Sequence, residues 1–171
     1  MKKNFLTLII FGILIIARAQ AEELKVGFAQ LSITPDLIDH WVDVNNDAQF
    51  DPDIDVWTDV NGNEKFDAVW MAGFQKQRPA QGIKDNLMAV AVVIDDGKNR
   101  IGIVTADTVG LMRKFVLGVR EAVPSEWGLD YLMVHATHNH EGPDTQGLWG
   151  PSLFSSGVDT DYMQQLQENI L

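Results

Sequence analysis

Apolar runs separated by turn residues mark three strands in this chain. The first covers residues 24–33, where apolar and polar positions alternate loosely, and is closed by Thr34-Pro35. The next two, residues 87–94 and 100–106, flank a polar turn at residues 95–99. Continuous apolar runs of this length, bounded by turn signals, are typical of buried strands. The second and third runs therefore predict a hairpin or two adjacent strands.

Two further segments have the spacing of amphipathic helices. In residues 109–123 the apolar positions recur every three or four residues, and Pro124 ends the pattern. Residues 159–171 begin with an Asp/Thr pair that resembles an N-cap. Between them, residues 128–134 form another strand candidate. The apolar helix positions are Leu111, Met112, Phe115, Val116 and Val119, then Tyr162, Met163, Leu166 and Ile170.

This order of elements predicts an α/β fold, a mixed sheet with flanking helices. Residues 36–81 interrupt it, because they are rich in Asp, Asn and Gly and show no helical or strand period. We interpret them as a long functional loop. The chain stops inside a helix whose apolar face has no later partner, so we expect an incomplete domain, the amino-terminal part of something larger.

The first 21 residues have the pattern of a signal peptide. Lys2 and Lys3 precede an apolar stretch at residues 5–16, and residues 19–21 (AQA) fit the small-x-small cleavage site before Glu22. We therefore expect a secreted or periplasmic protein with its mature chain at residues 22–171. The apolar stretch is short for a membrane span, although an uncleaved anchor is the alternative.

The chain is strongly acidic and has no cysteine. It carries 24 acidic and 13 basic residues, a net charge of −11. Loss of Lys2, Lys3 and Arg18 with the leader leaves 10 basic residues against 24 acidic ones, a net charge of −14. Such a surface repels nucleic-acid phosphates and suits a protein that binds cations. No disulfide can form.

The acidic residues of the loop form a repeat with an offset of 16 positions. In each copy, oxygen-bearing side chains alternate along the chain as they do in calcium loops. The side-chain ligand candidates are Asp43, Asn45, Asp47 and Asp51 in the first copy, and Asp59, Asn61, Asn63 and Asp67 in the second.

The repeat is not an EF-hand. The bidentate Glu expected at loop position twelve is replaced by Ile54 and Trp70, and no helical pattern flanks either copy. Gln49 and Lys65 stand where a backbone carbonyl would serve. A solvated acidic loop is the alternative, but oxygens that recur in register favour structural Ca²⁺. Aromatic residues interspersed in the loop either clamp it to the body or line a substrate groove: Trp41, Phe50, Trp57, Phe66 and Trp70.

Three of the four histidines lie within six positions. His135, His138 and His140 follow the apolar run at residues 131–134 and precede Gly142-Pro143. If the chain stays extended, His138 and His140 point to the same side, and the turn residues expose them. Two imidazoles on one side can hold a metal or handle protons. His135 would face the other side, where a structural role is expected.

Several segments, in this order, resemble the neutral/alkaline ceramidases, zinc amidases that release a fatty acid from ceramide. They are residues 26–35 (VGFAQLSITP), 81–83 (QGI), 89–94 (AVAVVI), 103–107 (IVTAD) and 136–143 (ATHNHEGP). The last is the most distinctive, since the family motif is Ala-Thr-His-Thr-His-Ser-Gly-Pro. The resemblance covers most of the mature chain.

The resemblance implies that His138 is a zinc ligand and that His140 lies in the active site. We expect Asp107 either to orient an imidazole from the second shell or to be the N-cap of the following helix. The sequence departs from the family at Asn139 and Glu141, and Glu141 predicts a more polar substrate pocket.

The expected function is a secreted zinc-dependent amide hydrolase, whose substrate is ceramide or another N-acyl amide. The family's remaining zinc ligands and catalytic serine match no position here, and a catalytic zinc needs about three protein ligands, so we expect this chain alone to be inactive. Contact with a membrane surface is left open, and the sequence carries no signal for an oligomeric state. The alternative is a non-enzymatic, calcium-stabilised binding module.

Overall fold

The computed structural model describes residues 23–171. The expected signal peptide, residues 1–21, lies outside the described residues. The secretion that it implies therefore stays a prediction. No helix of the described part combines the length and apolarity that a membrane crossing requires.

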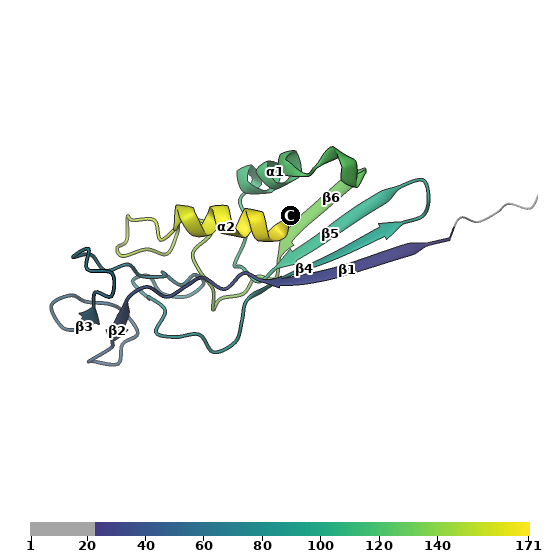
Figure 1. Ribbon diagram of the computed structural model, residues 1–171. Coiled ribbons are helices and arrows are strands. Elements are labelled where there is room, and N and C mark those ends of the chain that lie inside the picture. Colours follow the sequence, from purple (N-terminus) through teal and green to yellow (C-terminus); the bar gives the residue numbers. More distant parts are fainter. Residues whose placement is uncertain (1–22) are drawn as a thin grey trace, which may run out of the picture.

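A four-stranded mixed sheet forms one half of the molecule, and the loops and the acidic segment extend from one end of it (Figure 1). Its strands are β1 (Lys25–Ser32), β4 (Met88–Asp95), β5 (Arg100–Ala106) and β6 (Tyr131–Ala136), in the order β1-β4-β5-β6. The β1–β4 and β4–β5 pairs are antiparallel, whereas β5 and β6 are parallel. The predicted α/β fold, its mixed sheet and the β4–β5 hairpin are therefore confirmed.

Helix α1 (Arg113–Ala122) and the short 3-10 helix η1 (Ser125–Trp127) connect β5 to β6. The sequence placed the start of α1 at Val109, four residues too early. Residues 108–110 are not helical because their carbonyl groups accept hydrogen bonds from the loop after β6. The N-cap of α1 is Met112, so the alternative role of Asp107 as a helix cap was wrong.

Helix α2 (Thr160–Ile170) forms where its apolar spacing predicted it. The Asp159 carboxylate caps it by accepting from the backbone N–H groups of Asp161 and Tyr162. The buried Tyr162 hydroxyl donates to the Ile33 carbonyl, 3.0 Å away, and thereby ties α2 to the end of β1. Burial raises the pKa of this phenol well above its ordinary value.

Both helices lie on one side of the sheet, and the core forms between them and it (Figure 1). Strand β6 shows the alternation: Leu132 and Val134 are buried on the helix side, whereas Tyr131 and Met133 are exposed on the other. The opposite side of the sheet is therefore apolar and open to solvent.

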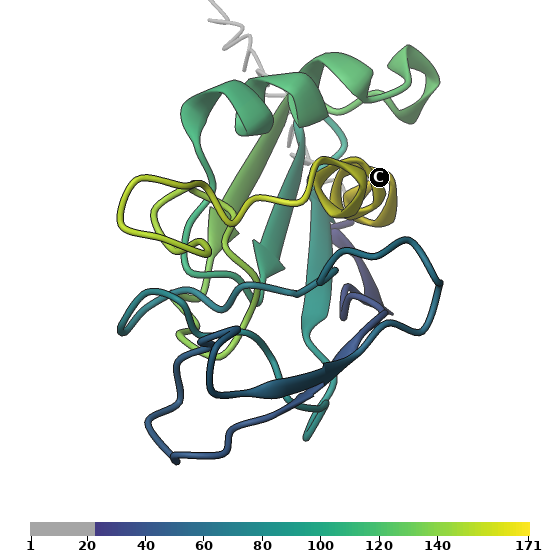
Figure 2. The ribbon, with the colours of Figure 1, turned by 90° about the vertical axis from the view of Figure 1, so that its left-hand side faces the viewer.

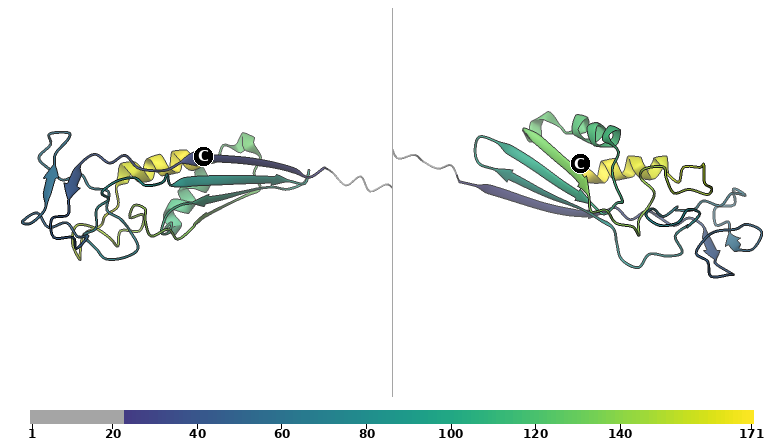
Figure 3. Two further views of the ribbon diagram at one scale, coloured as in Figure 1. Left: turned by 90° about the horizontal axis from the view of Figure 1, so that it is seen from below. Right: turned by 180° about the vertical axis from the view of Figure 1, so that it is seen from behind.

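Residues 36–81 are more ordered than a plain loop. They contain a small antiparallel hairpin of β2 (His40–Val42) and β3 (Val56–Thr58), in which Trp41 pairs with Trp57. The sequence analysis missed both strands, because three residues are too few to show a period. The hairpin lies beyond the end of the main sheet (Figures 1 and 3). Figure 2 looks onto that end, where the acidic segment and the loops after β6 gather.

Leu166 is fully buried where α2 meets the sheet. We expect Leu166→Ala to lower the free energy of unfolding by about 2–5 kcal/mol, because it removes apolar contacts and leaves a cavity. Urea denaturation measures this loss. Gln165→Ala, on the exposed side of the same helix, is the control. A loss as small in Leu166→Ala as in the control would contradict the packing of α2.

Candidate functional site

The histidine loop, residues 137–143, continues the pairing of β6 with β5 beyond the ends of both strands. The Thr137 N–H donates to the Ala106 carbonyl and the Asn139 N–H to the Thr108 carbonyl, both at 3.0 Å. Between them His138 has a φ of 66°, the left-handed region that β-carbons disfavour. The sequence analysis had assumed an extended chain through the histidines, and that assumption was wrong.

The two imidazoles nevertheless meet. Their Nε2 atoms are 3.3 Å apart, the ring centroids are 4.7 Å apart, and the ring planes are inclined by 77°. The Nδ1 atom of His138 lies 2.7 Å from the Val109 carbonyl. Because a carbonyl only accepts, Nδ1 carries the proton and the Nε2 lone pair of neutral His138 is directed at His140. Left-handed turning at His138, not strand alternation, brings the rings together.

His135 and Asp107 lie apart from this contact. His135 hydrogen-bonds Thr105 from its Nε2 atom, at 2.8 Å, on the exposed side of the sheet. The Asp107 carboxylate accepts from the Met88 N–H at 3.0 Å and from the Thr137 hydroxyl at 3.1 Å. It therefore fastens the start of the histidine loop to β4, while the Val109 carbonyl takes the orienting position beside His138.

A segment that the sequence analysis did not single out packs against His140. We call residues 70–80 the strap. It pairs with the end of the histidine loop, since the Ala72 N–H donates to the Gly142 carbonyl at 2.9 Å. Gly73 has a φ of +104°, and a β-carbon there would overlap the side chain of His140. The ring of Phe74 contacts that of His140, with centroids 5.2 Å apart. Gly73 was the one sign of this contact in the sequence, because a glycine often marks a place where another segment comes close to the backbone.

Arg78 joins the strap to the histidine loop. Its Nη2 group donates to the carbonyls of Ala72 and His140, each at 2.8 Å. Its Nη1 group lies 3.3 Å from the Glu141 carboxylate, and the guanidinium stands over the Phe74 ring at 5.0 Å. The Arg78 side chain is only 13% exposed.

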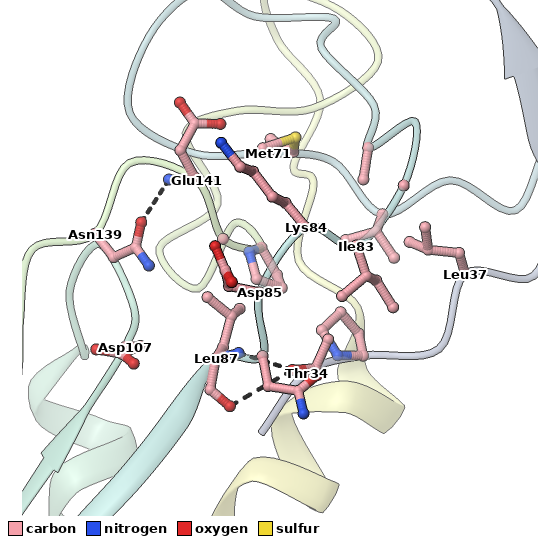
Figure 4. Close-up of a pocket in the computed structure, with 17 residues that line it drawn as sticks. Thr34, Leu37, Met71, Ile83, Lys84, Asp85, Leu87, Asp107, Asn139 and Glu141 are labelled. Carbon is pink, nitrogen blue, oxygen red and sulfur yellow. Dashed lines mark hydrogen bonds between the residues drawn. The ribbon is translucent and has the colours of Figure 1, made fainter. Parts of the chain in front are cut away.

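A cavity of about 580 Å³ opens on the other side of the histidine loop (Figure 4). Leu37, Val69, Met71, Ile83 and Leu87 give it an apolar wall. Asp85, Asp107 and Glu141 add carboxylates, with Lys84 and Asn139 beside them. Among the described residues, neither imidazole lines this cavity, although Asn139 and Glu141 flank His140 in the chain.

The two acidic copies cap each other, and we call residues 39–67 the acidic unit. Asp39 and Asp55 are themselves 16 positions apart and are buried, with 4% and 6% exposure. Each carboxylate accepts two backbone N–H groups from the opposite copy. The pairs are Asp55 with Val44 (2.9 Å) and Asp51 (2.8 Å), and Asp39 with Val60 (2.9 Å) and Asp67 (2.7 Å). The repeat thus includes two positions that the sequence analysis overlooked, and it forms one folded unit.

The calcium candidates lie in two loops of matching shape. Ala48 and Glu64, at equivalent positions, both have φ near +60°. Asp59 accepts backbone N–H groups, and that of Glu64 contributes most to lowering its pKa. The ionised Asp59 carboxylate therefore stabilises the fold at pH values above the ordinary Asp pKa. This stabilisation is lost as the pH falls through the lowered pKa of Asp59. Within residues 23–171, no group of three or more His, Cys, Asp or Glu side chains is arranged to hold a metal.

The interspersed aromatic side chains pack on one another between the copies. Phe50 stacks on Phe66 with centroids 4.2 Å apart, and Trp41, Trp57 and Trp70 surround this pair. These contacts bury Trp41 and Phe50, whereas Trp57, Phe66 and Trp70 stay half-buried.

Comparison with known proteins supports the fold. No protein-family model and no curated protein matches the chain. Among solved structures, the chain is similar to neutral ceramidase from Pseudomonas aeruginosa, with a TM-score of 0.57 and 18% sequence identity. The similarity covers 86% of this chain but 20% of that one. The chain therefore has a ceramidase-like fold and spans about a fifth of the length of that enzyme.

The reciprocal caps give a direct prediction. Asp55→Asn keeps one acceptor but turns an amide donor toward a backbone N–H group, so we expect a loss of about 1–3 kcal/mol in the free energy of unfolding. Asp53→Asn is the matched control, because Asp53 is exposed. Chemical denaturation followed by tryptophan fluorescence measures both. Equal stability of the two variants would show that the caps are unimportant.

Proposed function

We propose that this chain is the histidine-bearing part of a secreted, zinc-dependent amide hydrolase of the neutral ceramidase type. Two observations support the proposal: the ceramidase-like fold, and the close approach of the His138 and His140 imidazoles. The second carries it, because a fold alone does not specify a reaction.

The imidazole pair suits a zinc ligand with a neighbour that carries a proton. The two Nε2 atoms are 3.3 Å apart, so the His138 atom that could bind zinc lies beside the Nε2 atom of His140. The Val109 carbonyl also holds His138 in the tautomer whose Nε2 can bind a metal. His138 would be the ligand, and His140 would lie beside the metal.

Zinc bound here would supply Lewis acidity for a carbonyl group and would lower the pKa of a bound water. His140 would position the reacting groups and carry a proton at its Nε2 atom, and Asp107 would support the loop through Thr137. One imidazole ligand is fewer than the three or so protein ligands of a catalytic zinc. The remaining ligands would therefore come from outside this chain, which on its own would be inactive.

The cavity beside the histidine loop suits the proposed substrate class. Its apolar wall could hold a hydrocarbon chain, and its carboxylates could accept hydrogen bonds from amide or hydroxyl groups. An N-acyl lipid such as ceramide combines both. Export through the signal peptide and transient contact with a membrane surface would bring the enzyme to such a substrate.

Substitution of His138 tests the hydrolase proposal. We expect His138→Ala to abolish zinc binding in calorimetric titrations of the full-length protein, and to abolish its hydrolysis of a fluorogenic N-acyl amide. His135→Ala, on the opposite side of the sheet, should leave both unchanged. Hydrolysis that survives His138→Ala, or that survives removal of metal with a chelator, would contradict the proposal.

We further propose that the acidic repeat binds structural Ca²⁺. Oxygen-bearing side chains recur in register in both copies, and the loops share their left-handed positions. A cation would relieve the repulsion among the carboxylates. If zinc has no effect while calcium stabilises the fold, the non-enzymatic binding module becomes the better description.

Calcium should raise the melting temperature by mass action. A ligand at 100 times its Kd adds about 2.7 kcal/mol to the free energy of unfolding. Scanning calorimetry in calcium, in magnesium and in chelator measures the effect. The double variant Asp43→Asn/Asp59→Asn, which removes the first carboxylate of each copy, should lose the response. An unchanged melting temperature of the wild-type chain in calcium would refute the site.

A further inference from the structure

Little in the histidine loop itself fixes the ring of His140. His138 is held by its Nδ1 contact with Val109, but the hydrogen-bonding contact described for the His140 ring is the one with His138. An imidazole with a single hydrogen-bonding partner can rotate about its side-chain torsions unless packing holds it. The contacts that hold this ring must therefore come from elsewhere in the fold.

Those contacts come from the strap. Gly73 leaves room for the His140 side chain, since any larger residue there would collide with it. Phe74 meets the ring edge to face, at an interplanar angle of 79°. Arg78 fixes both the backbone and the aromatic partner, because it binds the His140 carbonyl and stands over the Phe74 ring.

The strap is held by a hydrogen bond within itself and by hydrogen bonds to two other parts of the fold. Its two halves are joined by the Met71 N–H, which donates to the Arg78 carbonyl at 2.8 Å. The Trp149 indole donates to the Phe74 carbonyl at 3.1 Å. The acidic unit holds the far end, where the Phe50 N–H donates to the Gln77 carbonyl at 2.7 Å. The position of Arg78 is therefore set by the surrounding fold and not by the histidine loop alone.

We infer that Arg78 is a positioning residue for His140: acting through the His140 carbonyl and the Phe74 ring, it keeps the His140 imidazole against that of His138. A guanidinium suits this task because its planar donors reach two carbonyls and a carboxylate at once. The ammonium of Lys lacks that geometry. The consequence for catalysis rests on the proposed function, but the positioning itself does not.

Nuclear magnetic resonance of the metal-free, 171-residue chain with isotopically labelled histidine rings measures the positioning directly. The wild-type chain should give a nuclear Overhauser cross-peak between ring protons of His138 and His140. We expect Arg78→Gln to reduce this cross-peak at least threefold, and Arg78→Lys to reduce it as well. Lys76→Gln is the matched control, since Lys76 is a strap cation that binds a single carbonyl, that of Leu153. The control should retain the wild-type intensity.

A purely structural role for Arg78 predicts a different result. It would lower the melting temperature while leaving the cross-peak of the folded protein intact, and that result would overturn the inference. If Arg78→Gln fails to fold, Phe74→Ala decides, because Phe74 is 60% exposed and its loss spares the core. A wild-type cross-peak in folded Phe74→Ala would equally overturn the inference.

Failure of the proposed function is a separate outcome. If the full-length protein binds no zinc, the proposed function fails, whereas the cross-peak still decides the role of Arg78.

Discussion

Parallel pairing that continues past the ends of β5 and β6 is the constraint on which the site depends. The carbonyls of Ala106 and Thr108 hold the backbone on either side of His138, and the Val109 carbonyl holds its ring. A left-handed residue is costly outside glycine. These three bonds offset that cost at His138 and leave its Nε2 atom directed at His140. The same bonds prevent residues 108–110 from joining α1.

The sequence predicted the sheet and its helices because their apolar spacing is a local property. The β4–β5 hairpin and β6 are visible as apolar runs bounded by turn residues, and α2 as a helical period. The start of α1 was misplaced because hydrogen bonds to a loop some thirty residues later in the chain override a helical pattern. Such bonds join residues distant in the chain, and no periodicity reports them.

For the site, the sequence identified the histidines and the acidic repeat but not their surroundings. His138 and His140 stood out by composition, yet their meeting depends on a left-handed turn that the sequence analysis did not anticipate. Arg78 and Phe74 carry no motif, and only the fold brings them to His140. Asp39 and Asp55 could have been identified from the sequence, since they have the same 16-residue offset as the other acidic positions. The hydrogen bonds that each makes to the opposite copy could not, because they depend on the tertiary fold.

The acidic unit and the histidine loop are joined by the strap, so that order in one supports order in the other. The Phe50 N–H binds the strap at Gln77, and Arg78, the next residue, binds the histidine loop.

Anomalous diffraction at the zinc absorption edge, from crystals of the zinc-loaded protein, tests most directly whether the imidazole pair is a metal site. We expect a single strong peak about 2.0–2.1 Å from the Nε2 atom of His138, with the His140 ring on the same side. A peak confined to the acidic unit, or two histidine rings turned away from each other with no metal between them, would contradict a zinc-dependent function for this loop.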